Sequence, residues 1–109
     1  MTILIRESGG ARIVDLEGEV DLGTSPNLRR TLFDLLGKTP KLALNLRALR
    51  YIDSSGIATL IEVLKDAQRL GKEFVLFGLS PAVHDTFRLT HVNRVFRIFD
   101  TEEQAVTSS

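Results

Sequence analysis

Two hydroxyl groups, a carboxylate and a glycine stand side by side in the segment Tyr51-Ile52-Asp53-Ser54-Ser55-Gly56-Ile57. The segment joins an apolar run ending near Leu46 to an amphipathic pattern from about Ser54 to Leu70, so the serines fall where a helix is expected to begin. The first N–H groups of a helix are unpaired and lie at the positive end of its dipole. Asp53 or Ser54 could simply cap this helix, but a phosphate would also be accommodated there.

Few other residues offer chemistry. The sequence has no cysteine, which excludes disulfides, thiolate catalysis and Cys-ligated metals. Ser54 does not stand in a G-x-S-x-G motif, and no phosphate-cradling G-x-x-x-x-G-K-[ST] loop is present. The two histidines, His84 and His91, indicate neither a catalytic triad nor a metal site. We therefore expect no enzymatic activity, no metal and no cofactor.

Charge and hydropathy narrow the range of partners. Lys and Arg total 14, and Asp and Glu total 14, so the formal net charge of zero gives no electrostatic reason to expect nucleic acid or an anionic membrane. No apolar run approaches the length of a membrane span, and the first residues lack the basic region and apolar run of a secretion signal. We expect a cytoplasmic protein without membrane insertion, formed by a single domain over residues 1–109.

The rest of the chain predicts the elements that position the turn. Short β-branched runs at 3–5 and 13–16 flank Ser8-Gly9-Gly10, which predicts an opening β-hairpin. Three further apolar runs, at 42–46, 74–77 and 95–99, are expected to be strands. Cap residues and helical spacing predict four helices, which begin near Ser25, Ser54, Ser80 and Thr101.

Two of these helices carry more specific expectations. Ser25 followed by Pro26 indicates a cap residue with proline at the first helical position. In the helix after the turn, apolar residues recur at the spacing of one buried face, so we predict that Leu60, Ile61 and Leu64 belong to the core.

Strands and helices alternate three times after the hairpin. This pattern predicts an α/β fold with a mixed, mostly parallel sheet of about five strands, about four helices and right-handed crossovers. Sites in such sheets lie beyond the carboxyl ends of strands, where helices begin. The turn at 53–56 occupies such a place. So does the loop from Gly18 to Ser25, if the second strand lies beside the third.

Five segments of the chain follow one another in the order found in a known family. They are Gly18-Glu19-Val20-Asp21, Leu44-Asn45-Leu46, the segment 51–57, Gly71-Lys72 and Leu79-Ser80-Pro81-Ala82-Val83. Over about residues 3–106 the chain therefore resembles a STAS domain, specifically the bacterial anti-sigma factor antagonists. The resemblance implies the STAS fold, in which alternating β/α units follow an N-terminal β-hairpin.

The resemblance also implies a binding module controlled by phosphorylation. Family members bind an anti-sigma factor that is also a serine kinase, and so release a sigma factor. The kinase phosphorylates the first serine of the Asp-Ser-Ser-Gly turn, and a PP2C-type phosphatase removes the phosphate. In this chain that serine is Ser54. The expected partner-binding residues are Asp21, Asp53, Ser54, Ser55 and Gly56.

Two other functions stay open. A non-regulatory STAS subunit of a lipid-transporting ABC complex, or of a signalling scaffold, would keep the fold without phosphorylation, although the pair Ser54 and Ser55 favours the regulatory role. Gene neighbourhood separates these two, since a kinase and a sigma factor accompany one and a permease and an ATPase the other. A small hydrolase that uses Ser54 is disfavoured because a base and oxyanion elements are missing.

Overall fold

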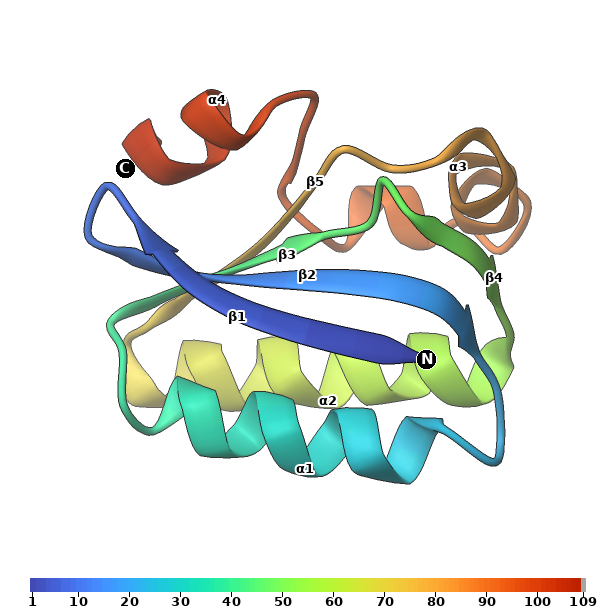
Figure 1. Ribbon diagram of the computed structural model, residues 1–109, viewed down its shortest axis with the longest axis horizontal. Helices are drawn as coiled ribbons and strands as arrows, with labels where there is room; N and C mark the ends of the chain where they lie inside the picture. Colours follow the sequence, from blue (N-terminus) through green and yellow to red (C-terminus); the bar gives the residue numbers. More distant parts are fainter. Residues whose placement is uncertain (109) are drawn as a thin grey trace.

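The computed structural model describes residues 1–108 and confirms an α/β fold built on a mixed sheet (Figure 1). The strands are β1 (Thr2–Ser8), β2 (Ala11–Val20), β3 (Lys41–Asn45), β4 (Leu49–Ile52), β5 (Glu73–Phe77) and β6 (Ile98–Phe99). The helices are α1 (Ser25–Leu36), α2 (Ser54–Leu70), α3 (Pro81–Leu89) and α4 (Glu102–Thr107), with a 3₁₀ turn at Val92–Arg94. The predicted helix starts are confirmed to within one residue.

The order of strands in the sheet is β1-β2-β3-β5-β6, and β4 pairs with β2. β1 and β2 form the predicted antiparallel hairpin around Gly9 and Gly10, which both have the positive φ angles of a type I′ turn. All other pairings are parallel, as the alternation of strands and helices predicts.

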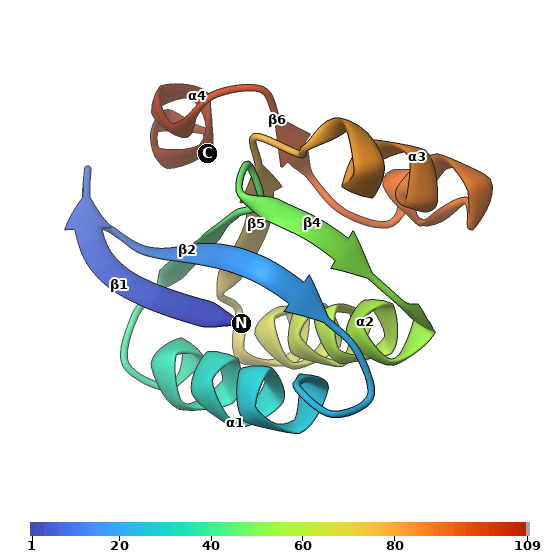
Figure 2. The same ribbon diagram turned by 45° about the vertical axis from the view of Figure 1, so that its right-hand side comes forward.

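Helices lie on both faces of the sheet. Figures 1 and 2 show α1 and α2 side by side on one face, whereas α4 lies over the other face near the hairpin turn. Val14 and Leu44 point into the large core under α1 and α2, and their neighbours Ile13 and Ala43 point into the smaller core under α4. Successive side chains of a strand point to opposite faces, which explains why the middle residues of β2 and β3 are apolar on both faces.

The sequence did not reveal β4. β2 pairs with β3 in its first half and with β4 near its end, and the register shifts between Gly18 and Glu19. Gly18 has a φ of 97°, a conformation that favours glycine, and its N–H donates to the backbone oxygen of Ala48 at 3.1 Å. The shift brings Val20 beside Ile52, immediately before the Asp-Ser-Ser-Gly turn.

The predicted last strand, at 95–99, is wrong over most of its length. Only Ile98 and Phe99 pair with β5. Phe96 instead packs into the large core, where it is 6% exposed and lies against two other phenylalanine rings. The alternating apolar pattern reflects a core anchor at this position, because a ring buried from an irregular segment gives the same spacing as a strand.

The buried face of α2 is also rotated from the predicted one. Leu60 is fully buried as predicted, but Ile61 and Leu64 are half-buried at the edge of the core. Val63, which was not predicted, and Ala67 are fully buried. Within the described residues, no helix combines the length and apolar character needed to cross the membrane.

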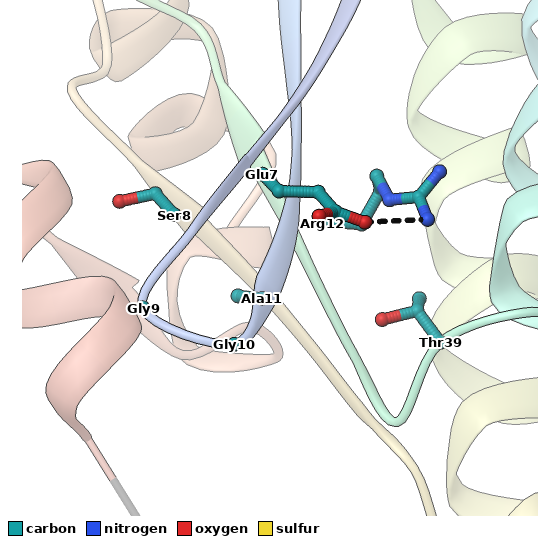
Figure 3. Close-up of a pocket in the computed structure, with 7 residues that line it drawn as sticks. All are labelled: Glu7, Ser8, Gly9, Gly10, Ala11, Arg12 and Thr39. Atoms are coloured by element: carbon teal, nitrogen blue, oxygen red, sulfur yellow. Dashed lines mark hydrogen bonds and ion pairs between the residues drawn. The ribbon is translucent and has the colours of Figure 1, made fainter.

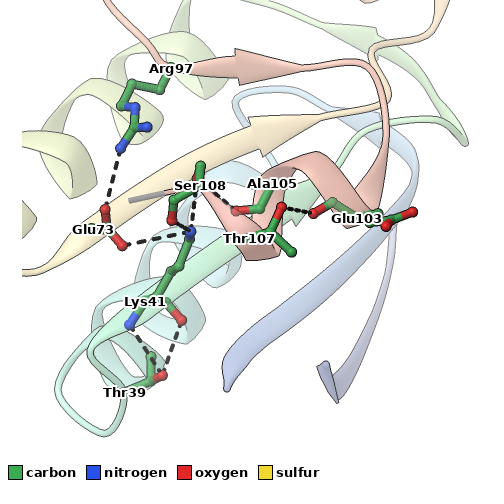
Figure 4. A network of polar contacts seen from close by, with 8 residues as sticks. All are labelled: Thr39, Lys41, Glu73, Arg97, Glu103, Ala105, Thr107 and Ser108. Atoms are coloured by element: carbon green, nitrogen blue, oxygen red, sulfur yellow. Dashed lines mark hydrogen bonds and ion pairs between the residues drawn. The ribbon is translucent and has the colours of Figure 1, made fainter. Parts of the chain in front are cut away.

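A buried lysine ties α4 to the sheet (Figure 4). Lys41 on β3 is 7% exposed, and its Nζ donates to the backbone oxygen and the hydroxyl of Ser108 at 2.7 and 2.9 Å. Glu73 lies 3.7 Å from the same ammonium group. These partners explain how a charged residue occupies an interior strand position, since a buried charge is tolerated when it is paired and hydrogen-bonded.

Candidate functional site

The carboxyl ends of β2 and β4 lie side by side, and each leads into a helix. Val20 pairs with Ile52, and the N–H of Asp53 donates to the backbone oxygen of Val20 at 3.1 Å. The loop 21–24 then enters α1 and Asp53 enters α2, so both helices start at the same end of the sheet (Figure 2). The predicted juxtaposition of these two segments is therefore present, although β4 rather than β3 flanks the end of β2.

Asp53 is the N-cap of α2. Its backbone is extended, and its Oδ1 accepts hydrogen bonds from the N–H groups of Ser55 at 2.9 Å and Gly56 at 3.2 Å. It also accepts a hydrogen bond from the Ser55 hydroxyl. That hydroxyl first, and then the two backbone N–H groups, lower the pKa of the Asp53 carboxyl. The carboxylate is thus held in its charged form beneath the first turn of the helix.

The two serines of the turn have different surroundings. Ser55 is half-buried, and its hydroxyl is bonded to Asp53. Ser54 is exposed as the first residue of α2, and its hydroxyl has no hydrogen-bond partner among residues 1–108. Ser54 therefore presents an unbonded hydroxyl at the positive end of a 17-residue helix.

Gly56 is buried against the ends of two strands. A Cβ atom at this position would lie 2.7 Å from a side-chain carbon of Ile52 and 2.7 Å from one of Val20. Only glycine lets α2 begin this close to β2 and β4. Gly56 is buried, so it supports the turn from beneath, and its role among the partner-binding residues stays a prediction.

Adding one methyl group at this position should loosen the site. We expect Gly56→Ala to lower the free energy of unfolding by about 1–3 kcal/mol, because Ile52 and Val20 must move apart. Guanidinium denaturation followed by circular dichroism measures this loss. Gly37→Ala is the matched control, since a Cβ there meets nothing closer than 3.5 Å and its change should stay within about 0.5 kcal/mol. Equal stability of the two variants would refute the close packing.

Asp21 organises the loop before α1. Its carboxylate accepts hydrogen bonds from the N–H groups of Gly23 at 2.9 Å and Thr24 at 3.1 Å, and its backbone oxygen accepts from Ser25 at 2.8 Å. Thr24, rather than Ser25, is the N-cap of α1. Ser25 is the buried first residue of the helix and Pro26 the second. The predicted cap was one residue too late, because the loop is closed by Asp21 and not by a serine hydroxyl.

Two exposed side chains next to the turn, Leu22 and Tyr51, were not among the predicted partner-binding residues. Leu22 is 77% exposed, and its backbone N–H faces the carboxylate of Asp53 and helps to lower its pKa. Tyr51 is 50% exposed and pairs with the acidic Glu19 across the two strands. The sequence did contain a signal for Leu22: it is an apolar residue between Asp21 and Gly23 in a polar loop, where no core is available to bury it. The surface around the turn is therefore both acidic and apolar.

The histidines lie elsewhere. His84 lines a hollow at the start of α3, and His91 lies in the turn after α3; both are exposed. Among residues 1–108, no three His, Asp or Glu side chains gather closely enough to hold a metal ion. The described geometry thus gives Ser54 an accessible hydroxyl without the histidine base of a nucleophilic triad.

The cap should make stability depend on pH. The folded-state pKa of Asp53 lies below its ordinary value of 3.8, so its contribution to stability is present above that value and is lost as the pH falls through the folded pKa. We expect Asp53→Asn, which keeps a cap oxygen but does not titrate, to lose less stability than wild type on acidification through this window. A carboxyl ¹³C NMR titration measures the pKa directly, and a value at or above 3.8 would contradict the assignment.

Comparison with known proteins shows which family has this architecture. The family model of the STAS domain matches residues 2–105. The chain belongs to the STAS domain family. This STAS domain is 28% identical over 100 residues to an anti-sigma F factor antagonist of Paenibacillus polymyxa, a match that covers 90% of this chain and 86% of the relative.

Solved structures share the fold of this STAS domain. The anti-sigma factor antagonist SpoIIAA in its unphosphorylated form matches with a TM-score of 0.80 at 18% identity, over 96% of this chain and 93% of that chain. The Bacillus cell fate determinant SpoIIAA in the phosphorylated form matches with a TM-score of 0.73 at 18% identity, over 96% of both chains. At this identity the likeness establishes the fold alone.

Proposed function

We propose that this STAS domain is an anti-sigma factor antagonist whose binding is controlled at Ser54. The unphosphorylated form binds an anti-sigma factor that is also a serine kinase, so that a sigma factor is released. The observation that carries this proposal is the exposed, unbonded hydroxyl of Ser54 beside a Ser55 hydroxyl committed to Asp53. The similarity to named anti-sigma factor antagonists, and the two phosphorylation forms in which SpoIIAA is solved, support it.

The turn suits a kinase substrate. The Ser54 hydroxyl is accessible without any hydrogen bond to break within the described chain, and Asp53 keeps the backbone on either side of it fixed. Transfer of the terminal phosphoryl group of ATP replaces the hydroxyl proton and leaves ADP. The phosphate adds a charge of about −1.5 to −2 at a helix N-terminus, where negative charge is stabilising by roughly 0.3–1 kcal/mol. The fold should therefore survive phosphorylation.

The surface around Ser54 indicates the chemistry of the partner. Leu22 and Tyr51 offer apolar contacts, and Glu19 and Asp21 are acidic. A complementary surface on the anti-sigma factor would combine an apolar patch with Lys or Arg at its rim. Asp21, Asp53, Ser54 and Ser55 would face this partner, and Gly56 would support them from beneath.

Reversal of the switch requires hydrolysis of the phosphoserine. A PP2C-type phosphatase would cleave the phosphorus–oxygen bond with water, restore the Ser54 hydroxyl and release inorganic phosphate. An exposed position on the first turn of α2 is accessible to such an enzyme, whereas the half-buried Ser55 is less so. The same exposure thus serves both the kinase and the phosphatase.

A kinase assay tests the proposal. The purified chain is incubated with ATP and each anti-sigma factor kinase of its own organism, and the product is analysed by tandem mass spectrometry. We expect phosphate on Ser54 in wild type and in the control Ser55→Ala, and none in Ser54→Ala. Phosphate on Ser55 alone would contradict the proposal. A chain that no kinase modifies, and that co-purifies with a permease and an ATPase, would instead be the transporter subunit.

A further inference from the structure

β1 is an edge strand that carries exposed apolar side chains. It pairs with β2 alone and runs along the front of the molecule in Figure 1. Leu4 and Ile5, at its centre, are 51% and 48% exposed. Edge strands are usually protected from pairing by lysine, proline or a bulge. β1 has none of these: its register with β2 is unbroken, and its one basic residue, Arg6, is bound to Asp15 and Glu102.

The hairpin turn determines which backbone groups of β1 face the free edge. Figure 3 shows the chain reversing tightly through Gly9 and Gly10. Ser8 and Ala11 flank this two-residue loop as opposite partners. In a two-residue hairpin the flanking pair is the hydrogen-bonded one. Hydrogen-bonded and non-hydrogen-bonded pairs alternate along an unbroken antiparallel ladder. The residues whose N–H and C=O groups point outward, away from β2, are therefore Ile3, Ile5 and Glu7.

From this edge we infer that β1 pairs in antiparallel fashion with β1 of a second copy of the chain. The two-fold axis passes beside Leu4, perpendicular to the sheet, so Ile3 of each copy lies opposite Ile5 of the other. The outward N–H and C=O groups of Ile3 and Ile5 then bond to one another. Leu4 meets Leu4 on the face that carries α4, and the isoleucines meet on the face that carries α1 and α2. This single register thus buries the exposed side chains of both Leu4 and Ile5 against the second copy.

Other registers fit less well. A two-fold axis perpendicular to the sheet relates each face of one copy to the same face of the other. Side chains alternate between the two faces, so the register can change only in steps of two residues. One step places Leu4 opposite Arg6, and the next places two Arg6 side chains opposite each other, which is repulsive. A step in the other direction places Leu4 opposite Thr2. Only pairing about Leu4 matches apolar with apolar on both faces.

The dimer would be weak and would leave the site around Ser54 accessible in both copies. A single strand pair buries an area at the low end of specific interfaces, so we expect a concentration-dependent dimer rather than an obligate one. Asp15 lies opposite Leu4 in the hairpin, and Val20 is five residues further along β2. At the usual rise of a strand, the Asp-Ser-Ser-Gly turn of each copy therefore lies about 17 Å from the two-fold axis, measured along β2. This inference does not depend on the proposed function.

Sedimentation velocity tests the inference. Wild type is measured from about 10 μM to about 1 mM, the range in which a weak complex becomes populated. Ile5→Pro removes an N–H that the ladder with β2 does not use, so it should keep the hairpin and raise the dimer Kd about tenfold or more. The control is Leu89→Ser, which removes a leucine that is 75% exposed far from this edge and should leave the Kd unchanged.

Amide hydrogen exchange supplies a second readout. The amides of Ile3 and Ile5 should exchange more slowly as concentration rises, whereas those of Leu4 and Arg6 should be protected at every concentration. Leu4→Lys keeps all backbone groups and brings two like charges together, so it should also disfavour the dimer. A wild type that stays monomeric up to about 1 mM, or dimerisation unchanged in both edge variants, or dimerisation abolished by Leu89→Ser, would overturn the inference.

Discussion

Ser54→Asp should remove most of the affinity for the anti-sigma factor while leaving the fold intact. The carboxylate stands in for the phosphate on the exposed first residue of α2. In the complex it would be desolvated beside the carboxylate of Asp53, away from the basic groups that we expect at the rim of the partner's surface. A buried, uncompensated charge costs roughly 3–5 kcal/mol. The affinity should therefore fall on the order of a hundred- to several-thousand-fold.

Titration calorimetry with the purified anti-sigma factor measures this effect. Ser54→Ala is the matched control, because it should bind like wild type and yet resist phosphorylation. Circular dichroism should show that both variants melt close to wild type, since negative charge is tolerated at a helix start. If Ser54→Asp binds as tightly as wild type, the proposed switch is wrong even though the fold is right. If it unfolds, the loss of binding carries no information about the switch, and the phosphorylated wild type replaces it.

The proposed separation of fold stability from partner binding has a structural reason. Asp53, not Ser54, caps α2, so the hydrogen bonds that define the turn run through a residue that the modification leaves unchanged. Ser55 supports that cap through its hydroxyl, and phosphate there would break the bond to Asp53. A switch at Ser54 alters the surface charge, whereas a switch at Ser55 would alter the turn itself.

Local signals in the sequence predicted the parts of this site that depend on local chemistry. The start of α3 is capped by Ser80 with Pro81 at the first helical position, and Thr101 caps α4, as their residue types indicate. Asp53 follows the same rule. Each of these caps uses N–H groups two or three residues away, so a short window of sequence contains all the information that determines it.

The remaining features depend on contacts between distant segments. β4 was missed because Leu49 and Ile52 are buried while the two residues between them are exposed, a pattern that matches neither an alternating strand nor a fully buried one. Its existence depends on the register shift at Gly18, which lies far away in the sequence. The close packing of Gly56 could not be predicted either, because it depends on the positions of Val20 and Ile52.

The rotation of α2 about its axis changes which of its residues should contribute most to stability. With successive residues about 100° apart, a stripe centred between Leu60 and Val63 leaves Leu64 about 70° and Ile61 about 130° from its centre. The observed burial follows this order: Leu60 and Val63 are fully buried, and the other two are half-buried. The apolar spacing alone allowed a centre closer to Leu64, because leucine and isoleucine are apolar wherever they point.

Leu60→Ala should therefore cost more stability than Leu64→Ala. Removing a fully buried leucine lowers the free energy of unfolding by about 2–5 kcal/mol, through lost burial and the cavity left behind. For the half-buried Leu64 we expect about half of that loss, because the solvent already reaches part of its side chain. Leu89→Ala, at a leucine that is 75% exposed, is the control and should change stability by less than about 0.5 kcal/mol. Guanidinium melts of the three variants rank them, and a larger loss for Leu64→Ala than for Leu60→Ala would show that α2 packs with the face that its sequence suggests and not with the observed one.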